Sequence, residues 1–298
     1  MIARANFLGC RVFPPSNLGE GEEHVVAIQA PDDTLIYLVD SDEFWKKDFI
    51  FDPEATLCDS DYPVFKRVDH IAQALDRLSI DRFVLFYKSV FGLHPQPVVE
   101  VNEPYGLTKS RAIVSENRGL RFTLNASDER NTSVGRLVRA ASGSVVHHIA
   151  FDTDNIFRMA ESMQQCASRD IFRRVPCNYY EELGVRYNFD PKLLEKLREY
   201  NIMYDRDAKG EFLHMSTEQF RDRFYFEIVQ RIGGYDGFAT LNGTFHMSVN
   251  QERREQTRRV PTSVPIQIQG GNNGNGLLAV YCAGSETPVE TSGYMLGK

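Results

Sequence analysis

Cysteines are few in this sequence, and their arrangement excludes two kinds of cross-linked structure. The chain has five of them, an odd number, at widely spaced positions and never as Cys-x-x-Cys. A disulfide scaffold needs paired cysteines, and a thiolate zinc site needs closely spaced ones. We therefore expect a reduced protein in the cytoplasm.

The sequence also lacks a long apolar run and an excess of positive charge. No stretch approaches the roughly 18 apolar residues that span a bilayer, and the N-terminus has no long apolar segment of a signal peptide. Lysine and arginine are spread along a chain of formal net charge −7. Membranes and nucleic acids are not expected as partners, because a basic patch favours binding to either.

The chain contains enough apolar residues for a sizeable core. Of its 298 residues, 42% are hydrophobic and 25% charged, which is typical of soluble globular proteins with one large or two modest domains. Apolar spacing predicts a strand at 68–73, a helix at 81–92 that ends at Gly92, and then three strands. The order starts again at Val145. This repetition predicts an α+β fold of repeated βαβββ modules.

The second module carries an insertion. Asp154 is expected to cap a helix at 155–166. Residues 178–201 then insert a further helix, in which Pro191 takes an allowed first-turn position. Strands at 211–216 and 223–231 complete this module.

The two ends of the chain differ from the modules. Residues 1–66 hold two strand-like runs with no amphipathic helix before them, so they are predicted to be the remnant of an incomplete N-terminal module. The paired modules would form a metal-binding domain over 67–251, and 252–298 would be a largely flexible tail. An incomplete module exposes a sheet edge, which favours a homodimer.

Histidines recur with the modules. His70 in VDHIA and His148 in VHHIA fall at equivalent positions, and a similar step along the chain reaches Glu227 in the apolar strand FYFEIVQR. Burying an ionised glutamate costs several kcal/mol unless it is paired or bound to a metal. Two imidazoles and one carboxylate are the ligand set of the facial triad that holds non-haem Fe(II). The pattern predicts His70, His148 and Glu227 as metal ligands.

A structural role is the alternative for each of these residues. A single histidine in a strand is more often a hydrogen-bonded core residue than a ligand, and Glu227 could pair with Arg111 instead. Three matched positions favour the metal. Strand alternation places His147 and His148 on opposite faces unless a bulge intervenes. The face of the strand that carries His148 also carries small residues, which suits a metal cavity. The face that carries His147 has bulky apolar residues, which suits contact with a covering helix.

Residues from about 34 to 250 resemble the vicinal oxygen chelate superfamily, and specifically the C-terminal two-thirds of 4-hydroxyphenylpyruvate dioxygenase. The matching segments are TLIYLVD, VDHI followed by FYKSVFG, FTLN, VHHIAFDTDNIF, YDRDAKGEFL and FYFEIVQR. The resemblance implies that His70, His148 and Glu227 bind a divalent metal, Fe2+ first, with Mg2+, Mn2+ or Co2+ as alternatives. It also implies a small organic acid as ligand, with Ser110 and Asn125 in its pocket.

Several positions depart from that dioxygenase. His214 replaces a glutamine, Ser216 replaces an aromatic residue, and His147 replaces the glutamine before the second ligand. The segment FATLNG, which adds Asn242 to the pocket, lacks the phenylalanine that helps to sandwich the substrate ring. Each lost ring stack is worth about 0.5–1.5 kcal/mol. Unchanged specificity for 4-hydroxyphenylpyruvate is therefore not expected.

The same departures resemble a second family. NYYEEL, LREYNIMYDRDAKGEFLHMST and RIGGYDGF are similar to the dioxygenase-like C-terminal region of bacterial-type 3-dehydroshikimate dehydratases. That family forms protocatechuate in quinate and shikimate catabolism, at a site in a preceding TIM barrel that this chain is expected to lack. The resemblance implies a metal-binding module of such a protein, with a homodimer or a TIM-barrel dehydratase as partner. The alternative is a non-haem Fe(II) dioxygenase acting on an aromatic or 2-oxo acid.

Overall fold

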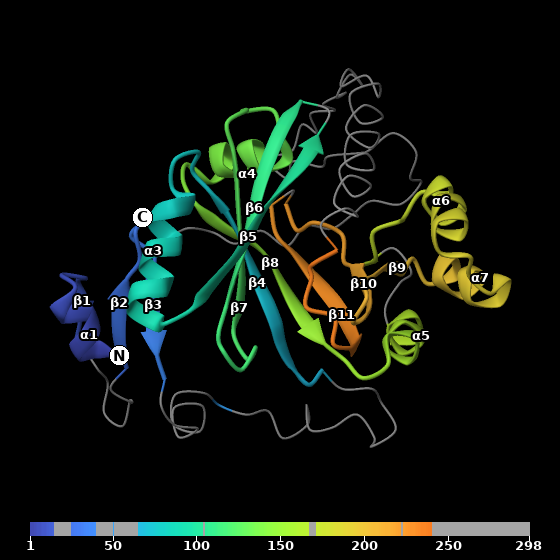
Figure 1. The fold of residues 1–298 in the computed structure, drawn as a ribbon, viewed down its shortest axis with the longest axis horizontal. Helices are drawn as coiled ribbons and strands as arrows, with labels where there is room; N and C mark the ends of the chain where they lie inside the picture. Colours follow the sequence, from blue (N-terminus) through green and yellow to red (C-terminus); the bar gives the residue numbers. More distant parts are fainter. Residues whose placement is uncertain are drawn as a thin grey trace, which may run out of the picture. The chain divides into compact units, whose positions relative to one another are not determined.

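The computed structural model describes residues 1–14, 25–39, 50, 65–103, 105–166, 171–221 and 223–239. Figure 1 shows their arrangement. The predicted tail at 252–298 and the predicted pocket residue Asn242 lie outside the described residues. Within these ranges, no helix is long and apolar enough to cross a membrane.

An eight-stranded sheet curls into a half-barrel at the centre of the fold (Figure 1). Its strand order is β5-β6-β7-β4-β8-β11-β10-β9. β4 runs parallel to β7 and antiparallel to β8, and β8 runs parallel to β11. The predicted α+β class is confirmed. The strands are β4 (Arg67–Leu75), β5 (His94–Glu103), β6 (Gly106–Val114), β7 (Arg121–Ser127), β8 (Val145–Asp152), β9 (Met203–Arg206), β10 (Gly210–Ser216) and β11 (Tyr225–Gly233).

Helix α3 (Ile80–Phe91) covers one face of β4, β6 and β7. Its apolar residues recur at helical spacing, and the buried ones form one core cluster with side chains of these strands. The Tyr87 hydroxyl donates to Gln73 Oε1 on β4. The helix ends at Gly92, which has a φ of 70°, in agreement with the prediction. We call the opposite face of the sheet, turned away from α3, the inner face.

Three helices pack on the other half of the sheet. The predicted insertion contains two helices rather than one, α6 (Cys177–Tyr187) and α7 (Pro191–Glu199), and they share a core cluster with α5 (Ile156–Cys166). The Tyr179 hydroxyl donates to the carbonyl of Tyr204 and accepts from its N–H, which ties α6 to β9. At the start of α5 the capping side chain is Asn155, not Asp154, which pairs with Lys66 instead.

Residues before β4 contain a helix that the sequence pattern does not predict. Helix α1 (Ile2–Phe7) precedes a three-stranded sheet of β1 (Val12–Phe13), β2 (Val26–Gln29) and β3 (Leu35–Leu38). This helix has six residues, of which only Ala5 is buried. Ala5 and Ile28 join the core cluster of α3. A further helix, α4 (Ser133–Ala141), follows β7 and is capped by Thr132.

Candidate metal centre

Three neighbouring strands bring the predicted ligands together. His70 lies on β4, His148 on β8 and Glu227 on β11, and these strands are adjacent in the sheet. Ala150 of β8 stands in register with both His70 and Glu227. Its small side chain is fully buried, so the ligands from the two flanking strands can approach each other across β8.

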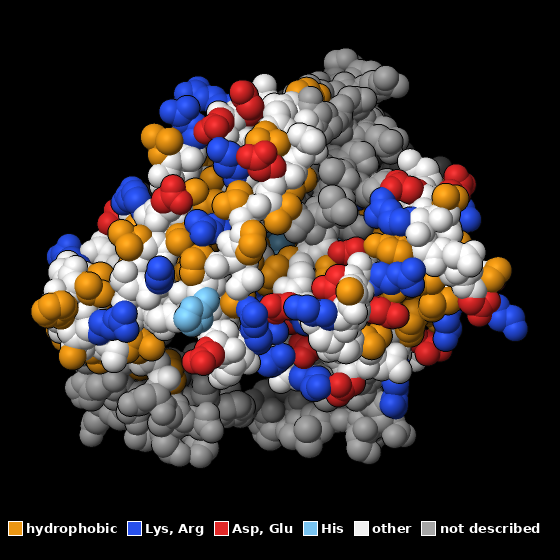
Figure 2. Space-filling view, viewed as in Figure 1, with side chains coloured by type: hydrophobic (Ala, Val, Ile, Leu, Met, Phe, Trp, Pro, Cys, Tyr) orange, Lys and Arg blue, Asp and Glu red, His pale blue; other side chains and the backbone are white. Residues whose placement is uncertain are grey.

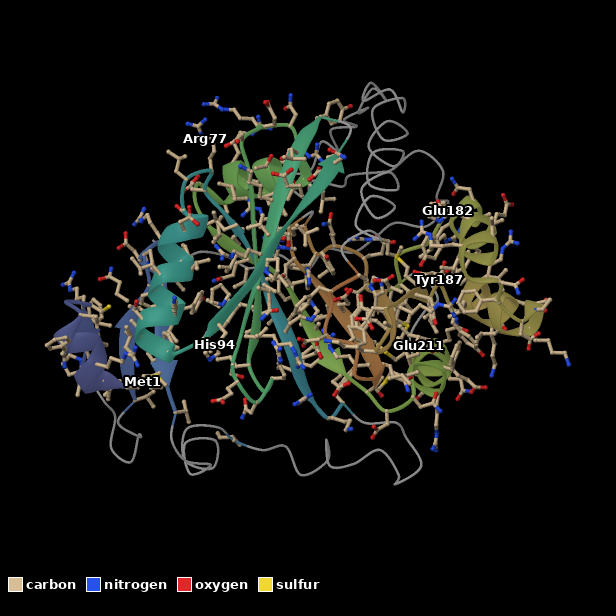
Figure 3. All side chains as sticks on the ribbon, in the orientation of Figure 1. Met1, Arg77, His94, Glu182, Tyr187 and Glu211 are labelled. Carbon is tan, nitrogen blue, oxygen red and sulfur yellow. The ribbon has the colours of Figure 1, made fainter. Side chains whose placement is uncertain are left out.

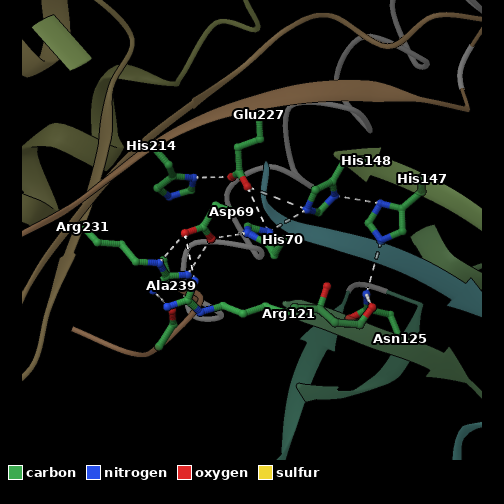
Figure 4. A network of polar contacts seen from close by, with 12 residues as sticks. Asp69, His70, Arg121, Asn125, His147, His148, His214, Glu227, Arg231 and Ala239 are labelled. Atoms are coloured by element: carbon green, nitrogen blue, oxygen red, sulfur yellow. Dashed lines mark hydrogen bonds and ion pairs between the residues drawn. The ribbon is translucent and has the colours of Figure 1, made fainter. Parts of the chain in front are cut away.

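The ligand atoms of the three residues point at one another (Figure 4). His70 Nε2 lies 3.2 Å from His148 Nε2 and 3.3 Å from Glu227 Oε2, and His148 Nε2 lies 3.7 Å from the same oxygen. In the described part of the chain, no other set of three His, Cys, Asp or Glu residues has its ligand atoms within 4.8 Å of one another. The side chains of His70, His148 and Glu227 are only 4%, 11% and 9% exposed.

His214 holds the second oxygen of the glutamate. It lies on β10, next to β11, and its Nδ1 is 2.7 Å from Glu227 Oε1. Burial alone would raise the pKa of Glu227, but hydrogen bonds from His214 and His70 hold this pKa well below its ordinary value. The carboxylate is therefore ionised, with one oxygen fixed by His214 and the other turned towards the two predicted histidine ligands.

A bulge in β4 places Asp69 behind His70. Val68 pairs with Phe151 and His70 with Ala150, so Asp69 is an extra residue in the ladder. Such a bulge breaks the alternation of side chains, and the Asp69 carboxylate accepts a hydrogen bond of 2.8 Å from His70 Nδ1. With its proton on Nδ1, the ring leaves Nε2 unprotonated and able to bind a metal.

Arg231 of β11 fixes Asp69 in turn. Its Nε donates to Asp69 Oδ2 at 2.8 Å and its Nη2 to Oδ1 at 2.9 Å, a two-point contact. Burial would raise the pKa of Asp69, but His70 and Arg231 hold it well below the ordinary value. A charged Asp69 is thus built into the support of His70. Neither Asp69 nor Arg231 is among the residues that the sequence pattern singles out.

A second bulge places His147 beside His148. On β8, His148 pairs with Ala72 and Val146 with Gln73, which leaves His147 as the extra residue. Strand alternation predicts that His147 faces a covering helix. Because of the bulge, it does not. Its Nδ1 lies 3.0 Å from His148 Nδ1, so both histidines belong to one cluster.

The ring of His147 contacts both His148 and Asn125. If His148 binds through Nε2, its Nδ1 carries the proton and donates to Nδ1 of His147, which must then accept. Burial is the main cause that lowers the pKa of His147 to about 4, so this ring is neutral near pH 7. Its Nε2 lies 3.3 Å from Nδ2 of Asn125, a nitrogen that also donates to the carbonyls of Gln73 and Thr123.

The other predicted pocket residues that the structure describes, Asn125, Ser110 and Ser216, lie on three further strands of the sheet. Asn125 on β7 reaches His147, and Ser110 on β6 stands directly opposite Asn125 in the ladder. Cross-strand partners share a face, which puts Ser110 on the inner face two strands from β4. Ser216 is buried and pairs in register with Glu227. All three are on the strands that surround the centre.

Aromatic side chains line the centre as well. The Tyr225 ring stacks on His148 with centroids 4.7 Å apart, and Phe238 meets the edge of His70 at 5.2 Å. The guanidinium of Arg173 lies over the ring of Tyr225, 4.7 Å from its centroid. The sequence pattern singles out none of the three: Phe238 and Arg173 lie outside the strands of the predicted ligands, and Tyr225 stands two residues before Glu227 on β11.

The residues present fit a divalent metal ion. Two imidazole nitrogens and one carboxylate oxygen are the donors of non-haem iron sites, and each is oriented from behind by Asp69, His147 or His214. Such support is typical of metal-binding histidines and carboxylates. The alternative partner for Glu227 is not used, because Arg111 donates to the carbonyl of Gln96 and lies near Asp81.

Comparison with known proteins gives two groups of relatives. No protein-family model matches this sequence. The chain is 40% identical to the 3-dehydroshikimate dehydratase of Pseudomonas putida over 249 residues, which cover 82% of this chain and 38% of the dehydratase. It is 26% identical to a 4-hydroxyphenylpyruvate dioxygenase of Legionella pneumophila over 238 residues, 78% of this chain and 66% of that protein. The chain thus spans well under half the length of the dehydratase.

Solved structures give a similar result. A fusion protein of a xylose isomerase-like TIM barrel and 4-hydroxyphenylpyruvate dioxygenase matches with a TM-score of 0.69 and 38% identity over 85% of this chain and 39% of its own. A mutant 4-hydroxymandelate synthase from Streptomyces coelicolor has a TM-score of 0.68 and 24% identity, over 84% of this chain and 73% of its own. At that identity the second likeness establishes the fold alone.

These matches correct the function expected from the sequence. That expectation was an accessory metal-binding module without a dehydratase barrel, or else an iron dioxygenase of an aromatic or 2-oxo acid. The match to the dehydratase covers 82% of this chain at 40% identity, well above the 26% to the dioxygenase. The chain is thus more similar to the 3-dehydroshikimate dehydratase than to the 4-hydroxyphenylpyruvate dioxygenase, and the expected accessory module or dioxygenase is not retained.

Proposed function

We propose that this protein is of the 3-dehydroshikimate dehydratase type and that its described part carries a divalent-metal centre formed by His70, His148 and Glu227. The observation that carries the functional half is the 40% identity to the dehydratase of Pseudomonas putida. The match covers only 38% of that relative. The dehydratase activity is therefore proposed for the whole protein as the cell makes it, and not for the described part alone.

The activity is tested with protein purified from cells that encode this chain. Loss of water from 3-dehydroshikimate leaves an aromatic catechol acid, protocatechuate, which is followed by its ultraviolet absorbance and by chromatography. We expect product to form with this protein and to disappear from extracts after deletion of the coding sequence. Unchanged conversion in the deletion strain, or no conversion by folded, metal-loaded protein, would contradict the proposal.

The metal is proposed to be Fe2+, because two histidines and one carboxylate with open positions are the ligand set of Fe(II) sites. Mg2+, Mn2+ and Co2+ are the alternatives. When bound, a divalent ion would polarise the carboxylate or oxo group of a small organic acid. Elemental analysis of protein purified without added metal, under anaerobic conditions, identifies the ion. An iron content near one per chain is expected, and a different metal at that level would replace iron in the proposal.

The surrounding residues have separate tasks in this proposal. Asp69 keeps the proton of His70 on Nδ1, and His147 does the same for His148. His214 holds Glu227 Oε1, so that the other oxygen faces the histidines. Tyr225 and Phe238 exclude water from two sides of the imidazoles by covering their rings. Arg173, positioned over Tyr225, contributes positive charge that favours an organic acid.

We further propose that the two halves of the sheet are copies of one βαβββ module, as in the vicinal oxygen chelate superfamily. The order β4-α3-β5-β6-β7 is followed by β8-α5 and, after α6 and α7, by β9-β10-β11, which supports this origin. The location in the cytoplasm and a second copy of the chain as partner also belong to the proposal. Sedimentation of the native protein tests the partner.

A further inference from the structure

A cavity of about 520 Å³ lies at one end of the half-barrel. It is formed where β4 and β7 begin and where β8 and β11 end. Figure 2 shows basic side chains gathered with acidic ones in the lower centre of this face, over the ends of these strands. A volume in this range fits a small organic molecule. The cations that line the cavity are Lys66, Arg67, Arg118, Arg121, Lys209 and Arg231.

The charges around this cavity are not balanced. Six cations line it with only three carboxylates, Asp152, Asp154 and Asp236. Each of these carboxylates is already paired at the rim: Asp154 with Lys66 at 2.7 Å, Asp236 with Arg118 at 2.9 Å and Asp152 with Arg67 at 3.5 Å. The cations that remain are Arg121, Lys209 and Arg231.

Arg121 is the deepest of the uncompensated cations. It begins β7 on the inner face and is only 5% exposed. Within the described residues, its Nε and Nη1 atoms have no hydrogen-bond partner. Buried polar groups of proteins are almost always hydrogen-bonded, so two unpaired guanidinium nitrogens at a cavity wall point to a ligand.

Asp69 cannot serve both arginines. Its two oxygens already accept hydrogen bonds from Arg231 and His70, and Arg121 Nη1 lies 3.6 Å from Oδ2, beyond a hydrogen bond. One carboxylate therefore faces two guanidinium groups. Arg121 lies at the wall of the cavity with a charge that no carboxylate there balances through a hydrogen bond.

We propose that this cavity, the Arg121 pocket, binds a small organic dianion whose phosphate or carboxylate oxygens accept hydrogen bonds from Arg121. A guanidinium group matches the planar arrangement of such oxygens. Lys209, exposed at the rim, contributes the second uncompensated charge. None of the three predicted metal ligands lines the pocket, and Asp69 lies between Arg121 and His70. This site does not depend on the proposed dehydratase activity.

Calorimetric titration of the whole protein at constant ionic strength tests the pocket. Inorganic phosphate and succinate are the two probes, and saturation by either one supports the site and identifies which oxyanion it prefers. We expect Arg121→Gln to weaken binding on the order of tenfold or more, because hydrogen bonds to charged groups are the strong ones. Lys209→Gln, at an exposed position that does not disturb folding, is expected to weaken binding several-fold.

Two control variants make the result specific. Arg77→Gln removes the same charge from an exposed turn after β4, at the opposite end of that strand from Lys66 and Arg67 (Figure 3), and should leave binding unchanged. His148→Ala should also leave it unchanged. Absence of saturable binding by both probes, equal weakening by Arg77→Gln and Arg121→Gln, or loss in His148→Ala with retention in Arg121→Gln would overturn the proposal.

Discussion

The residues that orient the two proposed histidine ligands stand immediately before them in the chain. Asp69 precedes His70, and His147 precedes His148. In an unbroken strand each would point away from the centre, but both are bulged residues. The same local device therefore gives each histidine a partner for its Nδ1. The centre depends on these two residues as well as on the three ligands.

Asp69→Asn tests this dependence at the first ligand. An amide accepts more weakly than a carboxylate and leaves Arg231 without its counter-charge, so metal affinity should fall by about 10–100-fold, as for other residues that orient metal ligands. Competition with a chelator of known affinity measures the change. Asp76→Asn, at an exposed turn, is the control. Equal affinities of wild type and Asp69→Asn would show that His70 needs no such support.

Two substitutions distinguish the hydrogen bond of His214 to Glu227 from the volume that its side chain fills. His214 donates to Glu227 Oε1 from Nδ1, and a glutamine amide could also donate there, whereas leucine could not. We expect His214→Leu to weaken metal binding by about tenfold and His214→Gln to retain most of it. The two variants are compared by the same chelator competition. If leucine and glutamine have the same effect, the hydrogen bond is not what positions Glu227.

At the scale of elements, the sequence predicts best where one periodicity dominates. The apolar alternation of β4, β8 and β11 and the helical spacing of α3 are read directly from the residues. Helix α4 was missed because SVGRLVRAA is too short to establish a helical period, and only Val134 is buried. The bulges could not be predicted, because register belongs to a pair of strands and not to one segment.

The end of α3 gives a prediction for stability. Gly92 has a φ of 70° and open space where a Cβ would stand. An alanine there would be destabilising only through the strain of its positive φ. We expect Gly92→Ala to lower the free energy of unfolding by about 1 kcal/mol, measured by denaturant titration. Gly143→Ala, also in open space but without a positive φ, should change it much less. A neutral Gly92→Ala would mean that the helix end rearranges.

At the scale of the whole molecule, a regular spacing in the sequence explains why three distant residues could be predicted to lie together. His70, His148 and Glu227 are 78 and 79 positions apart, and the sheet places their strands side by side. The contact between Asp69 and Arg231 joins residues 162 positions apart, and nothing in the pattern relates them. The Arg121 pocket depends in the same way on strand ends that meet only in the folded sheet.

The metal centre itself is tested most directly by anaerobic titration of the purified protein with Fe(II). One ion per chain is expected for wild type and for Glu195→Ala, an exposed control on α7, with saturable binding lost in Glu227→Ala. Circular dichroism of each variant verifies that it is folded. Absence of stoichiometric binding by the wild type, or unchanged binding by folded Glu227→Ala, would contradict the assignment of His70, His148 and Glu227 as a metal centre.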